Sequence, residues 1–113
     1  MTLLDIQSLL GAEVLCGEAY LDREVHSAYA SDFMSDVLAF AQGQGLLITG
    51  MVNPQVVRTA DMLDMKGILF VRGKRPGEDV LALARDRSLV ILCSSRCMFN
   101  ACGTLYSHGL AGE

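Results

Sequence analysis

The chain has 113 residues, of which 51% are hydrophobic, and its formal net charge at pH 7 is −4. This length suits one domain with a single core, and the apolar fraction excludes an intrinsically disordered chain. The acidic balance argues against a nucleic-acid binder, and no apolar run reaches the roughly 20 residues of a membrane-spanning helix. We therefore expect one cytoplasmic domain, residues 1–113, that binds neither nucleic acid nor membrane.

The first part of the chain predicts two helices and two strands. A capping-box arrangement, with Asp5 three residues after Thr2, begins the first helix, and Gly11 ends it. A second helix is expected after Ser31 and Asp32, either of which can serve as its N-cap. The strand candidates between these helices are residues 13–17 and 25–30.

The central part predicts a strand, a helix and a strand. Residues 46–49 and 68–71 are short apolar runs without alternation, which is typical of parallel strands covered on both faces. Asn53 can cap the helix between them, Pro54 suits its first position, and Gly67 can form its left-handed end. Two parallel strands need such a crossover helix.

The last part predicts a helix after residues 76–77, a strand at 89–93 and a final helix capped by Ser94 or Ser95. Apolar spacing assigns five residues to the inner face of that final helix: Met98, Phe99, Cys102, Leu105 and Tyr106. Strands and helices thus alternate along the chain. The pattern predicts an α/β fold of three layers, α/β/α, with a mostly parallel sheet of about four or five strands.

Six short segments carry a family resemblance. They are LCGE (15–18), LDREV (21–25), YASDFMSD (29–36), LITG (47–50), VRG (71–73) and CGTLY (102–106). In this order and spacing the chain resembles the DRTGG-domain family, and it is similar to the N-terminal domain of HPr kinase/phosphorylase without the kinase domain. The resemblance covers essentially the whole chain. It implies a single DRTGG-like α/β/α domain that acts as a regulatory module and forms a homodimer.

The chain departs from the family at the motifs that give it its name. Many relatives carry Gly-Asp-Arg and Thr-Gly-Gly where this chain has residues 52–54 (VNP) and 71–73 (VRG). The kinase activity does not carry over either, because the only Gly-Lys pair is followed by arginine and no phosphate-binding loop surrounds it.

Ligands of open parallel sheets bind beyond the carboxyl ends of the strands. Four of the nine basic residues lie in loops predicted there, which favours an anion such as a phosphorylated metabolite or a nucleotide. The candidate ligand-binding residues are Ser31, Asp32, Thr49, Gly50, Asn53, Arg72, Gly73, Lys74, Arg75, Ser94, Ser95 and Arg96. The alternative is a solvated basic loop that pairs with Glu78, Asp79 or a second subunit.

The cysteines predict neither a metal site nor a cofactor. Cys93, Cys97 and Cys102 are spaced more widely than zinc or iron–sulfur ligands, and buried reduced thiols explain them. No set of residues combines a nucleophile, a base and an orienting group, so we expect no enzyme.

The sequence therefore predicts a non-catalytic regulatory and dimerisation module that senses a small anion or nucleotide. The alternative is a protein–protein adaptor for a separately encoded metabolic enzyme, with no small ligand. A small phosphotransferase is the third and least favoured reading, because no activated nucleophile or phosphate-binding loop is visible.

Overall fold

The structure is a computed structural model that describes residues 1–112. The helices are α1 (Leu3–Leu10), α2 (Met34–Phe40), α3 (Pro54–Met62), α4 (Glu78–Asp86) and α5 (Met98–Ser107), with a short 3-10 helix, η1 (Glu18–Tyr20). The strands are β1 (Glu13–Cys16), β2 (Ser27–Ala30), β3 (Leu46–Thr49), β4 (Gly67–Phe70), β5 (Val90–Cys93) and β6 (Ala111–Gly112).

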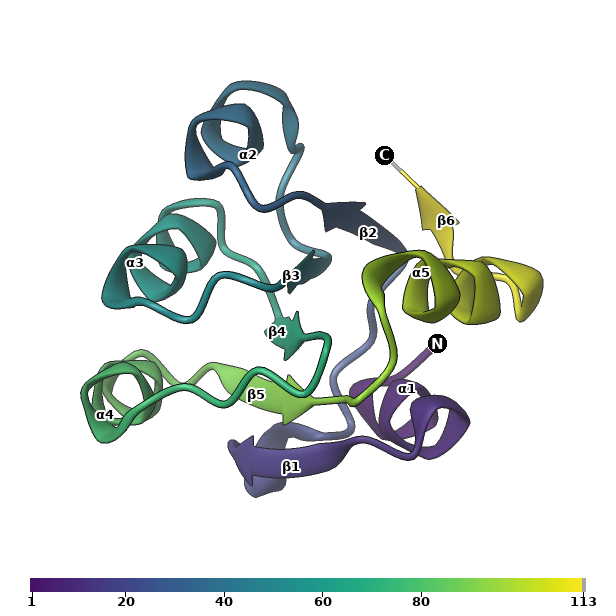
Figure 1. Ribbon diagram of the computed structural model, residues 1–113, viewed down its shortest axis with the longest axis horizontal. Helices are drawn as coiled ribbons and strands as arrows, with labels where there is room; N and C mark the ends of the chain where they lie inside the picture. The colour runs from purple at the N-terminus through teal and green to yellow at the C-terminus, as the bar shows by residue number, and fades with distance from the viewer. Residues whose placement is uncertain (113) are drawn as a thin grey trace.

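All the strands belong to one sheet in the order β1-β5-β4-β3-β2-β6 (Figure 1). The strands β5, β4, β3, β2 and β6 are all parallel to one another, and β1 pairs with β5 in the antiparallel direction. The predicted α/β fold with a mostly parallel sheet is confirmed. The sheet has one strand more than expected, because β6 has only two residues and leaves no pattern in the sequence.

The sheet lies between two layers of helices (Figure 1). Helices α1 and α5 cover one face, and α2, α3 and α4 cover the other. Alternate residues of each central strand serve the two faces: in β4, Leu69 packs under α1 and α5, while Ile68 and Phe70 pack under the opposite layer. The central strands are buried on both faces, which explains their unalternated apolar sequences.

The start and end of α1 are as predicted. The Thr2 hydroxyl accepts a hydrogen bond from Asp5 N at 3.1 Å, and the Asp5 carboxylate accepts one from Thr2 N at 2.9 Å. This reciprocal pair lowers the pKa of Asp5, chiefly through the hydrogen bonds with Thr2. Gly11 ends the helix in the left-handed conformation, with φ of 58°.

The predicted start of α3 is confirmed, with Asn53 at the N-cap position and Pro54 as the first helical residue, but its predicted cap bond and its predicted end are wrong. Asn53 occupies the N-cap position, but its side chain makes no capping hydrogen bond. Gly67 does not end the helix: α3 stops at Met62, Asp64 takes the positive φ of 55°, and Gly67 begins β4. A Cβ at Gly67 would lie 3.2 Å from the Leu3 side chain, so this glycine allows α1 to pack closely on the sheet.

Two further capping predictions are also wrong. The N-cap of α2 is Phe33 rather than Ser31 or Asp32, and the N-cap of α5 is Cys97 rather than Ser94 or Ser95. The hydroxyl of Ser31 accepts a hydrogen bond from Phe33 N, and that of Ser94 accepts one from Arg96 N, so each bonds inside its own loop.

The inner face of α5 is narrower than the apolar spacing suggested. Ala101 and Leu105 are its buried residues, and Met98 and Cys102 are partly buried against the same core. Phe99 and Tyr106 were predicted to be buried, but they are 89% and 72% exposed. At 100° per residue Phe99 points away from Ala101 and Leu105, and Tyr106 lies on the flank of the helix, next to its buried face.

Candidate functional site

The loops that follow β2, β3 and β4 meet at the carboxylate of Asp32. One oxygen of this carboxylate accepts hydrogen bonds from Gly50 N at 2.7 Å and from the Thr49 hydroxyl at 3.1 Å. The other oxygen forms an ion pair with the Arg72 guanidinium at 3.3 Å. The sequence placed these residues at the same edge of the sheet, and the structure brings them together. We call Asp32, Thr49, Gly50 and Arg72 the edge cluster.

The hydrogen bonds of the edge cluster favour the ionised form of Asp32. The backbone N–H of Gly50 has the largest effect and holds the pKa of Asp32 below its ordinary value, with smaller contributions from Thr49 and Arg72. Burial acts in the opposite direction and is outweighed. Asp32 is therefore a charged, fixed part of the edge cluster at neutral pH.

The loop after β4 is held in an unusual backbone conformation. Arg72 and Gly73 both have positive φ, 61° and 67°. Arg72 N donates to the Arg96 carbonyl at 2.7 Å and Gly73 N donates to the Ser94 carbonyl at 2.9 Å, which ties this loop to the one after β5. The Arg72 side chain then reaches back over Gly50, where a Cβ would collide with its guanidinium. The absence of a side chain at Gly50 is what lets Arg72 reach Asp32.

Two of the predicted basic residues turn away from the edge cluster. The Arg75 guanidinium forms two parallel hydrogen bonds with the Glu13 carboxylate, at 2.9 and 3.0 Å. This pairing lowers the pKa of Glu13 and draws Arg75 toward β1. The Arg96 side chain lies along α5, where it donates to Asn100 at 2.8 Å and to Thr104 at 3.4 Å.

Several polar groups near the carboxyl edge have no partner within residues 1–112. The Lys74 ammonium group makes no hydrogen bond or ion pair there, and Lys74 is exposed. The exposed hydroxyl of Ser95 also bonds to no described residue. The side-chain carbonyl of Asn53 is buried without a hydrogen-bond donor. Buried polar atoms are usually paired, so this unpaired oxygen is an exception among the described residues.

The carboxyl edge therefore presents an arginine whose carboxylate partner a ligand can replace, and a lysine that has no partner among the described residues. Arg72 is 42% exposed and is paired with one carboxylate oxygen only. A guanidinium recognises phosphate through two parallel hydrogen bonds, and an ammonium group adds a point charge. This arrangement can bind an anion; it contains no activated nucleophile next to a base.

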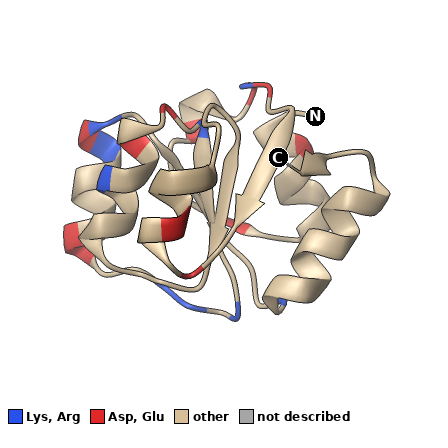
Figure 2. Cartoon of the chain, turned by 90° about the horizontal axis from the view of Figure 1, so that it is seen from above, with Lys and Arg blue, Asp and Glu red and all other residues tan. Residues whose placement is uncertain are grey.

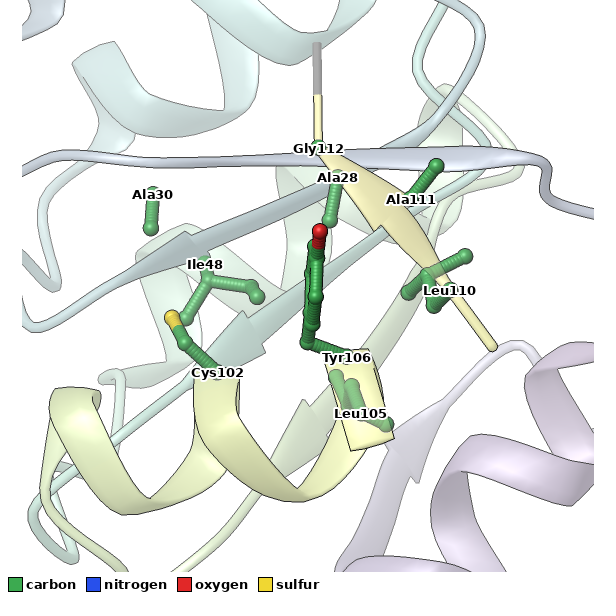
Figure 3. A pocket seen from close by; sticks show the side chains of 9 residues that line it. All are labelled: Ala28, Ala30, Ile48, Cys102, Leu105, Tyr106, Leu110, Ala111 and Gly112. Carbon is green, nitrogen blue, oxygen red and sulfur yellow. The ribbon is translucent and has the colours of Figure 1, made fainter. Parts of the chain in front are cut away.

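The structure also shows an apolar cavity that the sequence did not predict. It has a volume of about 170 Å³ and lies between α5 and the strands β2 and β6, at the β6 edge of the sheet (Figure 3). Its lining residues are Ala28, Ala30, Ile48, Cys102, Leu105, Tyr106, Leu110, Ala111 and Gly112. Small residues on β2 and β6 leave this space open. The two alternate alanines of β2, Ala28 and Ala30, were the available signal in the sequence.

The thiols do not form a metal site. Cys16 and Cys93 are buried, Cys102 is partly buried and Cys97 is exposed. Burial raises the pKa of Cys16, Cys93 and Cys102. Residues 1–112 contain no group of three or more metal-ligating side chains that could hold a metal ion. Within the same range, no helix is both long enough and apolar enough to span a bilayer.

Comparison by sequence finds no match: no family model and no curated protein matches this chain. The fold is similar to that in the crystal structure of the CBS and DRTGG domains of the regulatory region of Clostridium perfringens pyrophosphatase complexed with its activator, diadenosine tetraphosphate. The TM-score is 0.75 and the identity is 17% over 92% of this chain and 45% of the other. This chain thus corresponds to less than half of its neighbour's length.

At this identity the likeness shows the fold alone. The fold is α/β, and it occurs in a regulatory region that contains CBS and DRTGG domains. The likeness to HPr kinase/phosphorylase stays a prediction from the sequence.

Proposed function

We propose that this chain is a non-catalytic regulatory module of the DRTGG type that binds a nucleotide or phosphorylated metabolite at the carboxyl edge of its sheet. The observation that carries the proposal is the edge cluster, in which Asp32 holds Arg72 over Gly50, while the side chain of Lys74, two residues further along the same loop, has no partner among the described residues. The neighbouring fold belongs to a regulatory region solved with an activator nucleotide, which supports the same class of ligand.

Binding would use the edge cluster as follows. A phosphate oxygen replaces Asp32 as the partner of Arg72 and gains the Lys74 charge, so two cations face the anion. Asp32 keeps its hydrogen bonds to Gly50 and Thr49, which hold the loop in place after Arg72 is released.

The proposal is tested by calorimetric titration of the purified protein with inorganic phosphate, ATP, AMP and diadenosine tetraphosphate. Lys74→Ala and Arg72→Ala should each weaken the bound compound about tenfold, since each removes one charge-assisted contact of roughly 1.5 kcal/mol. Arg58→Ala is the control, because Arg58 is an exposed arginine on α3 that pairs with no described residue. No binding of any of these compounds, or an equal loss in Arg58→Ala, would contradict the proposal.

A second candidate function is an adaptor for a separately encoded metabolic enzyme. It is favoured by three apolar side chains on or beside α2 and α3: Phe33, Phe40 and Met62 are 69%, 70% and 71% exposed. Exposed apolar patches often mark protein interfaces. The adaptor would copurify with its enzyme from the native cell and lose it on Phe40→Asp, with ligand binding at the edge cluster unchanged.

A further inference from the structure

The C-terminal part of this protein lacks charge. Residues 97–112 contain no Asp, Glu, Lys or Arg, although this segment includes the whole of α5. The outward face of α5 instead carries Phe99 and Tyr106, which are 89% and 72% exposed. These two residues are seven apart, about two helical turns, so they lie on the same stripe of the helix, with Gly103 between them. An outward helix face of this kind is typical of an interface rather than of a surface in water.

The same side of the molecule carries both a projection and a hollow. Phe99 projects from the first turn of α5. The apolar cavity opens beside the same helix, bounded by Cys102 and Tyr106 on α5 and by Ala28 and Ala30 on β2 (Figure 3). Its volume of about 170 Å³ suits one aromatic ring, since an apolar cavity of roughly 150 Å³ accepts benzene.

A projection and a hollow on one helix are self-complementary under two-fold symmetry. When two α5 helices pair in antiparallel fashion about an axis between Cys102 and Gly103, each Phe99 lies opposite Tyr106 of the second copy. Each Phe99 ring is then next to the cavity of the other copy. Gly103 lies at the crossing point, where a Cβ position has no atom within 4 Å, so the helices can approach closely.

Charge also favours a second copy at this face. Two copies of a protein with net charge −4 repel each other, and an approach through an uncharged face avoids placing like charges together. Figure 2 shows Lys, Arg, Asp and Glu concentrated on the helices of the opposite layer, while α5 is almost free of them. Helix α1, beside α5, adds the half-exposed Leu4 and has Asp5 as its one charged residue.

We propose that two copies of this chain associate through α5 about a two-fold axis, and that each inserts Phe99 into the α5–β2 cavity of the other. This gives the homodimer predicted from the sequence a surface and an anchor residue. The proposed dimer does not depend on ligand binding at the edge cluster. A standard interface buries about 800 Å² on each partner, so the outward side of α1 belongs to it together with α5.

The test is the molar mass of the full chain, measured by sedimentation or light scattering up to high micromolar concentration. The wild type should be a dimer. Phe99→Asp should raise the dissociation constant at least about 30-fold, the effect of losing a buried aromatic anchor and adding a charge. Because Phe99 is exposed in one copy, the variant should keep the wild-type circular dichroism spectrum.

Two further variants separate this surface from others. Phe40→Asp is the matched control: Phe40 is 70% exposed but lies on α2, in the opposite layer, so the dimer should persist. Ala30→Leu fills the cavity from β2 and should also weaken the dimer. A monomeric wild type overturns the proposal and leaves a different protein or a lipid surface as the occupant. A dimer that Phe40→Asp dissociates, or one that Ala30→Leu leaves intact, overturns it as well.

Discussion

The two helical layers of this protein are alike inside and different outside. The inward faces are built from the same kind of residue: Leu3, Ile6 and Leu105 in one layer correspond to Val37, Val56 and Val80 in the other. The outward faces differ in charge. Asp5 is the single charged residue among the 8 of α1 and the 10 of α5. Helices α2, α3 and α4 carry Asp36, Arg58, Asp61, Glu78, Asp79, Arg85 and Asp86.

This difference separates two requirements. A helix that covers a sheet needs an apolar inward face, because burial there supplies the free energy of folding. The outward face is not constrained by the core, so its composition reflects what the helix contacts. Water accounts for the charged layer. A second copy of the chain accounts for the uncharged layer, as proposed above.

The largest loss of stability is expected from a substitution on an inward face, where the two layers are alike. Leu105→Ala, at a fully buried position of α5, should lower the free energy of unfolding by about 2–5 kcal/mol through lost burial and a cavity. Met62→Ala, at a 71% exposed position of α3, should change it by no more than about 0.5 kcal/mol. Urea denaturation measures both. Similar losses in the two variants would show that the inward face of α5 does not carry the stability.

A smaller effect is expected at the edge cluster. Asp32 has a lowered pKa in the folded protein, so its ionised form stabilises the fold above the unfolded-state pKa of about 4. Protonation removes this contribution as the pH falls through the folded-state pKa. Asp32→Asn keeps an acceptor for Gly50 but loses the ion pair with Arg72, and should cost about 1 kcal/mol at pH 7.

The measurement for Asp32 is the urea midpoint from pH 7 to pH 2. The difference between Asp32→Asn and wild type should shrink as the pH falls below about 4, because the wild-type carboxylate is then protonated. Asp36→Asn is the control, since Asp36 is exposed on α2 and its carboxylate bonds to no other described residue. A difference that stays constant over the whole range would mean that Asp32 acts through shape rather than charge.

The smallest effect is expected from the ion pairs of the charged layer. Arg87 and Asp61 form a 2.6 Å pair between the end of α4 and α3, with side chains 39% and 40% exposed. Arg87→Ala should lower the free energy of unfolding by about 0.5 kcal/mol, and roughly 1 M salt should erase the difference. Arg58→Ala removes an unpaired arginine from α3 and should have no such effect. A loss for Arg87→Ala that persists in salt would assign this residue a packing role.

The sequence was informative where α1 begins and ends and where the central strands lie. The capping box at Thr2 and Asp5 and the left-handed Gly11 were predicted because they are local hydrogen-bond and backbone effects. The unalternated apolar runs of β3 and β4 predicted a parallel sheet, since only a strand buried on both faces tolerates them. The placement of Thr49, Gly50 and Arg72 at one edge then followed from the direction of parallel strands.

The tertiary structure decided what depends on residues far apart in the chain. Asp32 caps no helix because Gly50, 18 residues away, donates to its carboxylate at 2.7 Å. Arg75 leaves the edge because Glu13, 62 residues away, pairs with it. Phe99 faces outward because Ala101 and Leu105 occupy the positions of α5 against the sheet, while Tyr106 borders the cavity beside them. The sequence by itself determined the elements and their order; competition between distant partners for each side chain determined the site and the exposed face of α5.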